Sequence, residues 1–171
     1  MDVVGAARYA NLVGWWENLG FGSWQGHVLT DSLEGPWSVF AADLNDDNRI
    51  DIIASAMTAG QVVWWENGID GWHEHVVAEW FPYSKSVAVA DFNGDGLNDI
   101  LASSYGYDRI TKAENTGTGW SEHILTNQFA GVRAVHADDV DRDGDIDVLG
   151  AADSAGIWWW ENQDTTWIRH M

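Results

Sequence analysis

Short apolar segments separated by glycine, asparagine and aspartate form the basic pattern of this chain. In one well-defined stretch the segments fall at residues 86–90, 98–103, 109–114 and 120–125, and small residues fill the first of them. Their apolar positions show no helical period, and their lengths and boundaries are typical of β-strands. The pattern predicts a protein built from short antiparallel strands.

The pattern repeats along the chain. A Trp-Trp-Glu-Asn segment occurs at residues 15–18, 64–67 and 159–162, with a degenerate Lys-Ala-Glu-Asn copy at residues 112–115. Each copy is followed by a Trp-x-x-His segment: Trp24/His27, Trp72/His75, Trp120/His123 and Trp167/His170. Four short strands in a unit of about 48 residues match the size of a propeller blade. The sequence therefore predicts an all-β fold, a β-propeller of four-stranded antiparallel blades, with about 3.75 blades in this chain.

The repeat divides one partial propeller domain, residues 1–171, into blades. An incomplete blade at residues 1–30 lacks its inner strand, and full blades follow at residues 37–80, 85–127 and 132–171. The small first strand of each unit suits the crowded position next to the propeller axis. Adjacent residues of a strand point to opposite faces, so both tryptophans of each Trp-Trp pair are expected to lie between blades.

An acidic segment between the first and second strand of each unit carries the candidate chemistry. In residues 139–147 (Asp-Val-Asp-Arg-Asp-Gly-Asp-Ile-Asp), carboxylates occupy positions 1, 3, 5 and 9, and Gly144 occupies position 6. Calcium takes about six to eight oxygen ligands, and alternate residues of a tight loop converge on one point. The glycine allows the sharp turn that this convergence requires. We therefore predict a calcium site in this loop.

The same segment occurs twice more, at residues 43–51 and 91–99, with first positions 48 residues apart in both steps. The predicted ligands are Asp43, Asn45, Asp47, the Arg49 carbonyl and Asp51; Asp91, Asn93, Asp95, the Leu97 carbonyl and Asp99; and Asp139, Asp141, Asp143, the Asp145 carbonyl and Asp147. Asn48 replaces glycine at position 6 of the first segment, so we expect that site to bind most weakly. One such segment is also typical of a solvated turn, but the fixed spacing favours up to three Ca²⁺ sites.

Charge and composition narrow the setting of these sites. The 171-residue chain is 46% hydrophobic with a net charge of −19, and 12 of its 27 acidic residues lie in the three segments. This charge disfavours nucleic acid and anionic membrane surfaces as partners. The chain has no cysteine, no apolar run long enough for membrane insertion and no signal peptide. Sites of modest affinity suit millimolar external calcium, which favours an extracellular or cell-surface location.

The acidic segments differ from EF-hand loops, which need a glutamate at position 12 and flanking helices. Ala54, Ala102 and Gly150 stand at that position. The acidic nonamer, the apolar strand after it and the Trp-Trp-Glu-Asn segment instead resemble the FG-GAP/VCBS repeat family over essentially the whole chain. The resemblance implies integrin-α-like calcium-binding propeller blades, with calcium in the turn between the first two strands of each blade. A fungal lectin of the same fold binds sugars between blades, but no motif here carries that activity over.

Three functions are compatible with a calcium-binding propeller. The first is a scaffold in which calcium only fastens strands together. The second is a binding module for protein or carbohydrate partners, with a lectin as the more specific alternative; aromatic residues outside the repeated positions are its best candidates, namely Trp37, Trp80, Tyr105 and Tyr107. The third, an enzyme, is disfavoured on two grounds. The Trp-x-x-His histidines recur with the repeat, and His136, which stands outside it beside Asp138, lacks a nucleophile motif. We predict no catalytic residues.

The start of the chain bears on assembly, because Asp2 aligns with position 9 of the acidic segments. Propellers usually close about four to eight blades into a ring. Three arrangements follow: a small four-bladed ring, a larger ring made with a second copy, or part of a longer chain. We favour self-association as a homodimer, because the terminal faces, with Trp15 or Trp16 at one end and Trp159 or Trp160 at the other, need covering.

Overall fold

The computed structural model describes residues 1–79, 81–163 and 166–171, which form antiparallel sheets joined by short connections. The first sheet contains β1 (Val3–Ala7), β2 (Leu12–Gly20) and β3 (Ser23–Thr30). The second contains β4 (Pro36–Ala42), β5 (Asp51–Ala56), β6 (Gln61–Gly68) and β7 (Gly71–Ala78). The third contains β8 (Ser84–Ala90), β9 (Asp99–Ser104), β10 (Arg109–Asn115) and β11 (Trp120–Thr126), and the fourth contains β12 (Val132–Asp138), β13 (Asp147–Ala152), β14 (Gly156–Gln163) and β15 (Thr166–His170). Single 3₁₀ turns, η1 (Arg8–Ala10) and η2 (Tyr105–Tyr107), follow β1 and β9.

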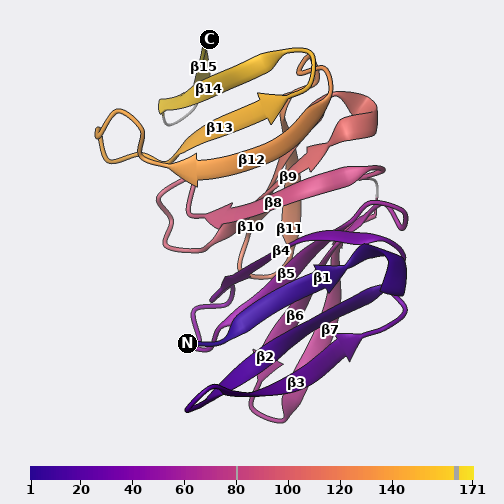
Figure 1. Ribbon diagram of the computed structural model, residues 1–171. Helices are drawn as coiled ribbons and strands as arrows, with labels where there is room; N and C mark the ends of the chain where they lie inside the picture. Colours follow the sequence, from indigo (N-terminus) through magenta and orange to yellow (C-terminus); the bar gives the residue numbers. More distant parts are fainter. Residues whose placement is uncertain (80, 164–165) are drawn as a thin grey trace.

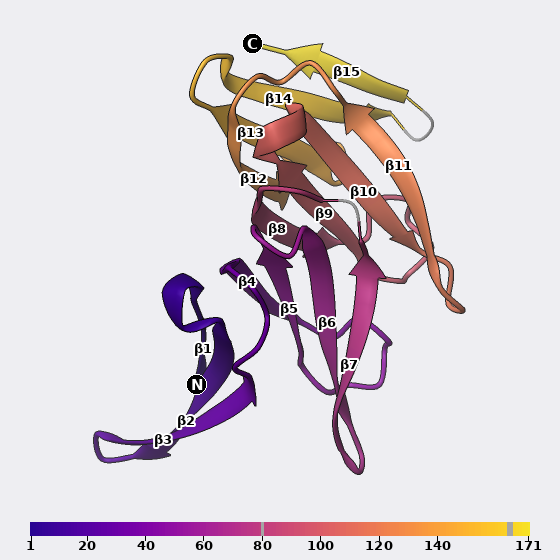
Figure 2. The ribbon, with the colours of Figure 1, turned by 90° about the vertical axis from the view of Figure 1, so that its right-hand side faces the viewer.

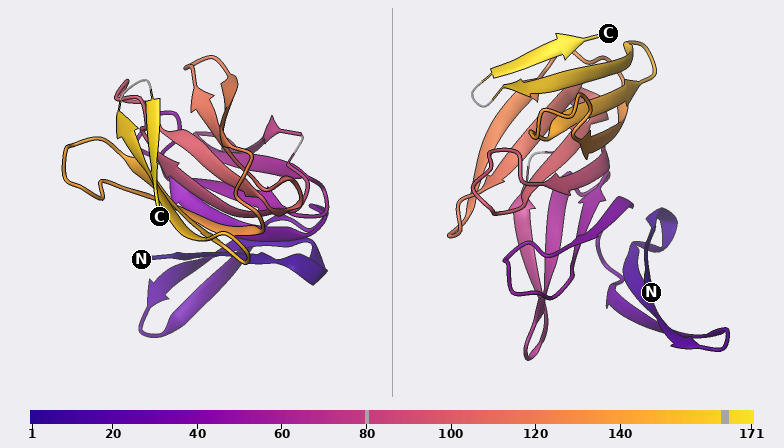
Figure 3. Two further views of the ribbon diagram at one scale, coloured as in Figure 1. Left: turned by 90° about the horizontal axis from the view of Figure 1, so that it is seen from above. Right: turned by 90° about the vertical axis from the view of Figure 1, so that its left-hand side faces the viewer.

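The sheets are arranged as successive blades of a propeller. In each sheet the strands lie side by side in sequence order, and the sheets follow one another from the indigo to the yellow end of the chain (Figures 1 and 2). β4, β8 and β12 pack on one another as inner strands, while β7, β11 and β15 form outer edges. The chain ends lie on the first and last sheets (Figure 3, right). The predicted all-β propeller architecture is confirmed, and the four strands expected between residues 86 and 125 are β8 to β11.

The first sheet has three strands, and its strand pairing resembles that of the last three strands of the other sheets. β1 pairs with β2 in the register in which β5 pairs with β6, so that Val3 lies opposite Trp16 as Ile52 lies opposite Trp65. β1 is therefore the counterpart of a second strand, and it packs against the inner strand β4 of the next sheet.

The hydrophobic core is divided among the contacts between neighbouring sheets. One cluster joins the first and second sheets around Val13 and Trp65, another joins the second and third around Ile53 and Ile100, and a third joins the third and fourth around Trp160. The second strands β5 and β9 are buried at every position because both their faces are covered. Each sheet is therefore stabilised mainly by its neighbours.

The Trp-Trp pairs divide their two indoles between the two faces of each sheet. The second indole faces the preceding sheet, and it is buried at Trp65 and Trp160 but 41% exposed at Trp16, in the first sheet. The first indole is half-buried at Trp15, Trp64 and Trp159. The expectation that both indoles are buried between blades is therefore met only in part, because the first indole is half-buried near the outer strand.

The Trp-x-x-His histidines complete this outer region. His27, His75 and His170 stack on the first indole of their own sheet, with ring centroids 4.2, 4.6 and 4.4 Å apart. Each Nε2 also lies within hydrogen-bond distance of the glutamate of the Trp-Trp-Glu-Asn segment, at 3.1, 3.0 and 2.7 Å. These contacts give the recurring histidines a packing role.

Within the described residues, the structure contains no helix long and apolar enough to cross a membrane.

Candidate metal centres

Each acidic segment forms the loop between the first and second strands of a full sheet, as expected. We name them loop 1 (residues 43–51, between β4 and β5), loop 2 (91–99, between β8 and β9) and loop 3 (139–147, between β12 and β13). Position 6 has the predicted left-handed backbone in all three loops, with φ of 64° at Asn48, 89° at Gly96 and 104° at Gly144. Position 4 is left-handed too, at Asp46 and Arg142 as well as at Gly94, which the sequence analysis did not anticipate.

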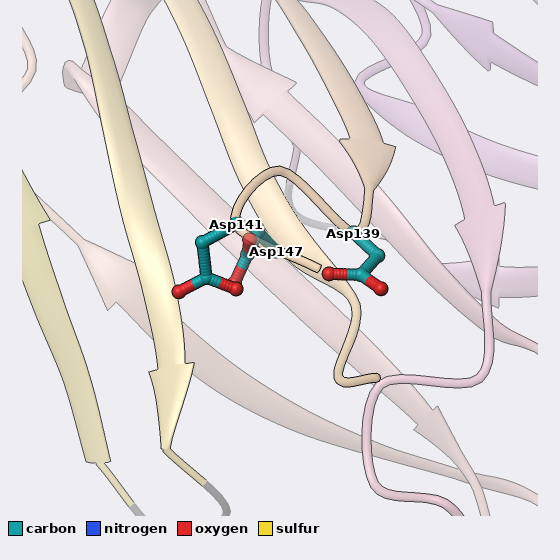
Figure 4. A group of neighbouring side chains, drawn as sticks. All are labelled: Asp139, Asp141 and Asp147. Carbon is teal, nitrogen blue, oxygen red and sulfur yellow. The ribbon is translucent and has the colours of Figure 1, made fainter. Parts of the chain in front are cut away.

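Loop 3 brings its carboxylates closest together. Asp139, Asp141 and Asp147 each place a carboxylate oxygen within 4.8 Å of the other two, on the inside of the loop (Figure 4). The position-5 residue Asp143 instead accepts the Asp145 main-chain N–H at 3.0 Å. Among the described residues, such a group of three acidic or imidazole side chains is found only in this loop. The structure thus converges three of the four predicted side-chain ligands of loop 3.

The chemistry of these three groups suits a cation. The Oδ1 atom of Asp139 is buried without a hydrogen-bond partner, which is costly for a carboxylate oxygen. Burial and the neighbouring Asp143, Asp147 and Glu161 carboxylates raise the pKa of Asp141. Oxygen ligands of this kind are what calcium prefers, and a divalent ion would relieve both the repulsion and the unpaired oxygen.

The aspartate at position 9 ties each loop to the strand beside it. Asp51, Asp99 and Asp147 are fully buried, and the Oδ1 of each accepts the main-chain N–H of the asparagine in the Trp-Trp-Glu-Asn segment, at 2.8, 2.8 and 2.9 Å. In the first sheet Asp2 accepts the Asn18 N–H at 3.0 Å, which agrees with its alignment to position 9. Burial raises the pKa of Asp51 and Asp99, although these N–H donors oppose the shift.

Loop 1 contains a positively charged side chain of its own. The Arg49 guanidinium pairs with Asp47 at position 5 and donates to the Asn67 carbonyl. Asp43 accepts the Asp47 and Asn48 main-chain N–H groups at 3.2 and 2.7 Å, so its oxygens are engaged within the loop. The sequence predicted the Arg49 carbonyl as a ligand. It did not show that the Arg49 guanidinium would pair with Asp47 and so compete with a metal ion for that carboxylate. This pairing adds a second physical reason to expect weak binding at loop 1.

Loop 2 also has a neighbouring cation. The Nζ of Lys112 lies 3.7 Å from Asp99 and 3.0 Å from Glu114, and its side chain is only 14% exposed. Lys112 stands where the other units have the first tryptophan of the pair. Asp91 accepts the Gly94, Asp95 and Gly96 N–H groups. The lysine partly neutralises loop 2 and repels a second cation, so loop 3 is the most favourable of the three sites.

The roles of the glutamate and asparagine beside the loops were not predicted from the sequence. Glu66 accepts a hydrogen bond from Asn45 Nδ2 at 3.0 Å, which joins position 3 of loop 1 to the outer histidine. A signal was present, because Glu-Asn survives in the Lys-Ala-Glu-Asn copy, where both tryptophans are lost. That pattern indicates that Glu-Asn serves the loop and Trp-Trp serves the packing.

Loops 1 and 2 are each also held by the sheet that follows. Asn115 of the third sheet donates from Nδ2 to the Leu44 carbonyl of loop 1 at 2.9 Å, and Asn162 of the fourth sheet donates to the Phe92 carbonyl of loop 2 at 2.8 Å. The Leu44 and Phe92 side chains are buried in the core shared with that following sheet. Position 2 of a loop is therefore a point of attachment between sheets.

The fold and the loops define the class of protein: a β-propeller whose blades carry an acidic loop between their first and second strands. The model of the FG-GAP-like repeat matches residues 43–102 and 91–150, which together span more than half of the chain. The chain belongs to the FG-GAP-like repeat family.

Comparison with known proteins adds a structural likeness. No curated protein sequence matches the chain. Among solved structures, the chain is similar to a mutant of AofleA from Arthrobotrys oligospora, with a TM-score of 0.64 and 19% identity over 93% of this chain and 49% of that chain. At this identity the likeness concerns the fold alone. The chain spans about half the length of that structure.

Proposed function

We propose that this protein is a calcium-binding propeller that serves as a binding or scaffold module. The observation that carries the proposal is the convergence of Asp139, Asp141 and Asp147 around the unpaired Asp139 oxygen in loop 3. Loops 1 and 2 would bind further ions through Asp43, Asn45, Asp47, Asp51 and the Arg49 carbonyl, and through Asp91, Asn93, Asp95, Asp99 and the Leu97 carbonyl. Calcium would neutralise the carboxylates and fasten each loop to its strands.

Calorimetric titration of the metal-free protein tests this proposal. Because the loops offer only oxygen ligands, calcium is expected to bind more tightly than zinc, with loop 3 filled first and loop 1 last. The variant Asp141→Asn is expected to remove the tightest binding event, and Asp31→Asn, an exposed aspartate outside the loops, serves as the control. Binding of zinc with higher affinity, or no calcium binding at millimolar concentration, would contradict the proposal.

The role as a module follows from the shape of the site. The loop ions would be enclosed by their own strands, and the recurring histidines are engaged by Trp and Glu, so we propose no enzymatic activity. The partner is a protein or a carbohydrate, in an extracellular or cell-surface setting where calcium is millimolar. A lectin is the alternative. A glycan array probed with and without calcium tests this alternative. Saturable, calcium-dependent sugar binding would favour a lectin, and a blank array would favour a scaffold or a protein partner.

We also propose that the chain associates with a second copy. Trp16 is 41% exposed on the first sheet and Ile157 is 74% exposed on the last, so apolar surface is open at both ends of the arc. The similar AofleA chain is about twice as long, and a second copy would supply the equivalent of its other half. Light scattering is expected to give twice the chain mass of 19.0 kDa, and a compact monomer at micromolar concentration would contradict the proposal.

A further inference from the structure

A β-bulge recurs at the start of each inner strand. The pairing of β4 with β5 skips Trp37, the pairing of β8 with β9 skips Lys85, and the pairing of β12 with β13 skips Arg133. These residues stand 48 positions apart, so the bulge belongs to the repeat while its side chain differs in every sheet. A bulge re-aims its side chain away from the regular alternation, and such positions often lie beside functional sites. Here it directs one variable side chain per full sheet to the same end of the inner strands.

The bulged side chains meet residues from the turns that follow β1 and β9. Trp37 lies between Arg8 and Lys85, whose cationic groups are 4.8 and 5.3 Å from its ring centroid. Tyr105 lies between Lys85 and Arg133, at 3.6 and 5.0 Å. We call these five residues the cation–aromatic row. The row alternates cation and aromatic ring across all four sheets.

The backbone around Tyr105 is held in a strained conformation. Tyr83 has a left-handed φ of 61° at the repeat position where the other full sheets have Gly35 and Gly131. Its carbonyl accepts the Tyr105 N–H at 3.2 Å, and its ring lies against Gly106, where a Cβ would collide with it. A bulky residue at such a φ is costly and persists where the surroundings require it. Tyr83 therefore fixes the turn that presents Tyr105 to the row.

The charge of the row stands out in this acidic protein. It holds three of the eight lysine and arginine residues of a chain whose net charge is −19. Arg133 pairs with Asp153 at 2.6 and 2.5 Å, whereas Arg8 and Lys85 form no ion pair with any carboxylate that the structure describes. Burial and the nearby Arg133 and Arg8 lower the pKa of Lys85. Arg8 and Lys85 therefore have no paired carboxylate, although Asp153, the partner of Arg133, also acts on Lys85 at longer range.

The row lies far from the metal loops along the sheets. Its bulged residues stand at the beginning of β4, β8 and β12, and the loops follow the ends of the same strands. The surface is accessible, since Trp37 is 39% exposed and the Arg133 side chain is 48% exposed. A ligand at the row would thus be recognised independently of the loops.

We propose that the cation–aromatic row binds an acidic saccharide, with carboxylate or sulfate groups at Lys85, Arg8 and Arg133 and a sugar ring against Trp37. Cations of this kind form strong charge-assisted hydrogen bonds with such anions, and an exposed indole offers an apolar face to the C–H groups of a sugar. The linear order of the row across the sheets suits several linked sugar units. This inference rests on the proposed role as a binding module and gives that module a ligand class.

Calorimetric titration tests the row with two pairs of probes: a uronic-acid tetrasaccharide with its neutral methyl ester, and a sulfated tetrasaccharide with its desulfated form. The acidic member of at least one pair is expected to bind at least about tenfold more tightly than its neutral partner, since each charged hydrogen bond is worth about a factor of ten or more. The pair that responds identifies carboxylate or sulfate as the recognised group. Affinity is expected to fall with added salt.

Variants locate the binding. The double variant Lys85→Gln with Arg133→Gln is expected to lose at least about tenfold in affinity, whereas Arg169→Gln, which removes an exposed cation on β15, is expected to leave it unchanged. Equal binding of acidic and neutral probes, no binding of either acidic probe, unchanged affinity in the double variant, or preference for an acidic peptide would each overturn the proposal. An unchanged melting curve would show that the double variant is folded. Removal of calcium with a chelator tests the calcium proposal separately.

Discussion

Removal of calcium is expected to lower the melting temperature of this protein by at least about 5–10 °C. A ligand that binds only the folded state at about one hundred times its Kd stabilises that state by about 2.7 kcal/mol. For a domain of this size, about 1 kcal/mol shifts the melting temperature by about 2–4 °C. The estimate covers one filled site, and the close carboxylates of loop 3 repel one another when the ion is absent. Differential scanning calorimetry in millimolar calcium and in chelator measures the shift.

Two controls accompany the chelation experiment. Adding excess calcium back is expected to restore the melting temperature, and magnesium at equal concentration is expected to restore less of it, because magnesium demands a more rigid octahedral site. Melting curves that coincide with and without chelator would rule out calcium as a source of folding free energy here.

The second large effect is expected from Asp139→Ala. In calcium this variant is expected to lose about 2–3 kcal/mol of unfolding free energy, most of the contribution of one site. Asp43→Ala, at the same position of loop 1, is expected to lose less, because Arg49 already pairs with Asp47 in that loop. The exposed Asp31→Ala is expected to change the free energy little. Denaturant unfolding of the three variants and the parent protein measures the differences.

Chelator provides the sharper comparison for Asp139→Ala. Without an ion the Asp139 carboxylate repels its neighbours and keeps an unpaired buried oxygen, and only its bond from the Gly144 N–H opposes these costs, so its removal is expected to cost little or to stabilise the protein. A loss of equal size in calcium and in chelator would mean that Asp139 supports the loop through the hydrogen bond that it accepts from the Gly144 N–H rather than through metal binding.

The sequence was sufficient to predict the fold because the same segments recur along the chain and form the same local structure each time. The Trp-Trp-Glu-Asn segment and its Lys-Ala-Glu-Asn copy marked the same strand in every unit, and the acidic segment marked the loop before the second strand of each full unit. Strands with both faces covered leave little choice of architecture. The loops were found for the same reason, including the left-handed backbone at Asn48. Patterns that recur are visible in sequence because each copy supports the reading of the others.

Features that break the repeat could not be predicted in the same way. The approach of Lys112 to Asp99 depends on the space left by a missing tryptophan, which only the packed sheets reveal. The meeting of Lys85 with Trp37 joins residues of two sheets through bulges that leave no mark in the sequence pattern. Trp80, which was expected to be an exposed aromatic residue of a binding module, lies outside the described residues. Long-range side-chain proximity of this kind arises from the assembled structure.

The hydrogen bonds from Asn115 to Leu44 and from Asn162 to Phe92 each connect a loop of one repeat to the next repeat. The group of residues that unfolds cooperatively is therefore offset from the sequence repeat. Free energy gained from an ion in loop 1 or loop 2 would be shared with the following sheet, whose asparagine side chain is attached to that loop. In a linear array with nearest-neighbour coupling, such a staggered link makes adjacent units open together. An ion in loop 1 or loop 2 would thus also stabilise the contact of that loop with the next sheet, so these two ions would act on overlapping pairs of sheets rather than on single ones.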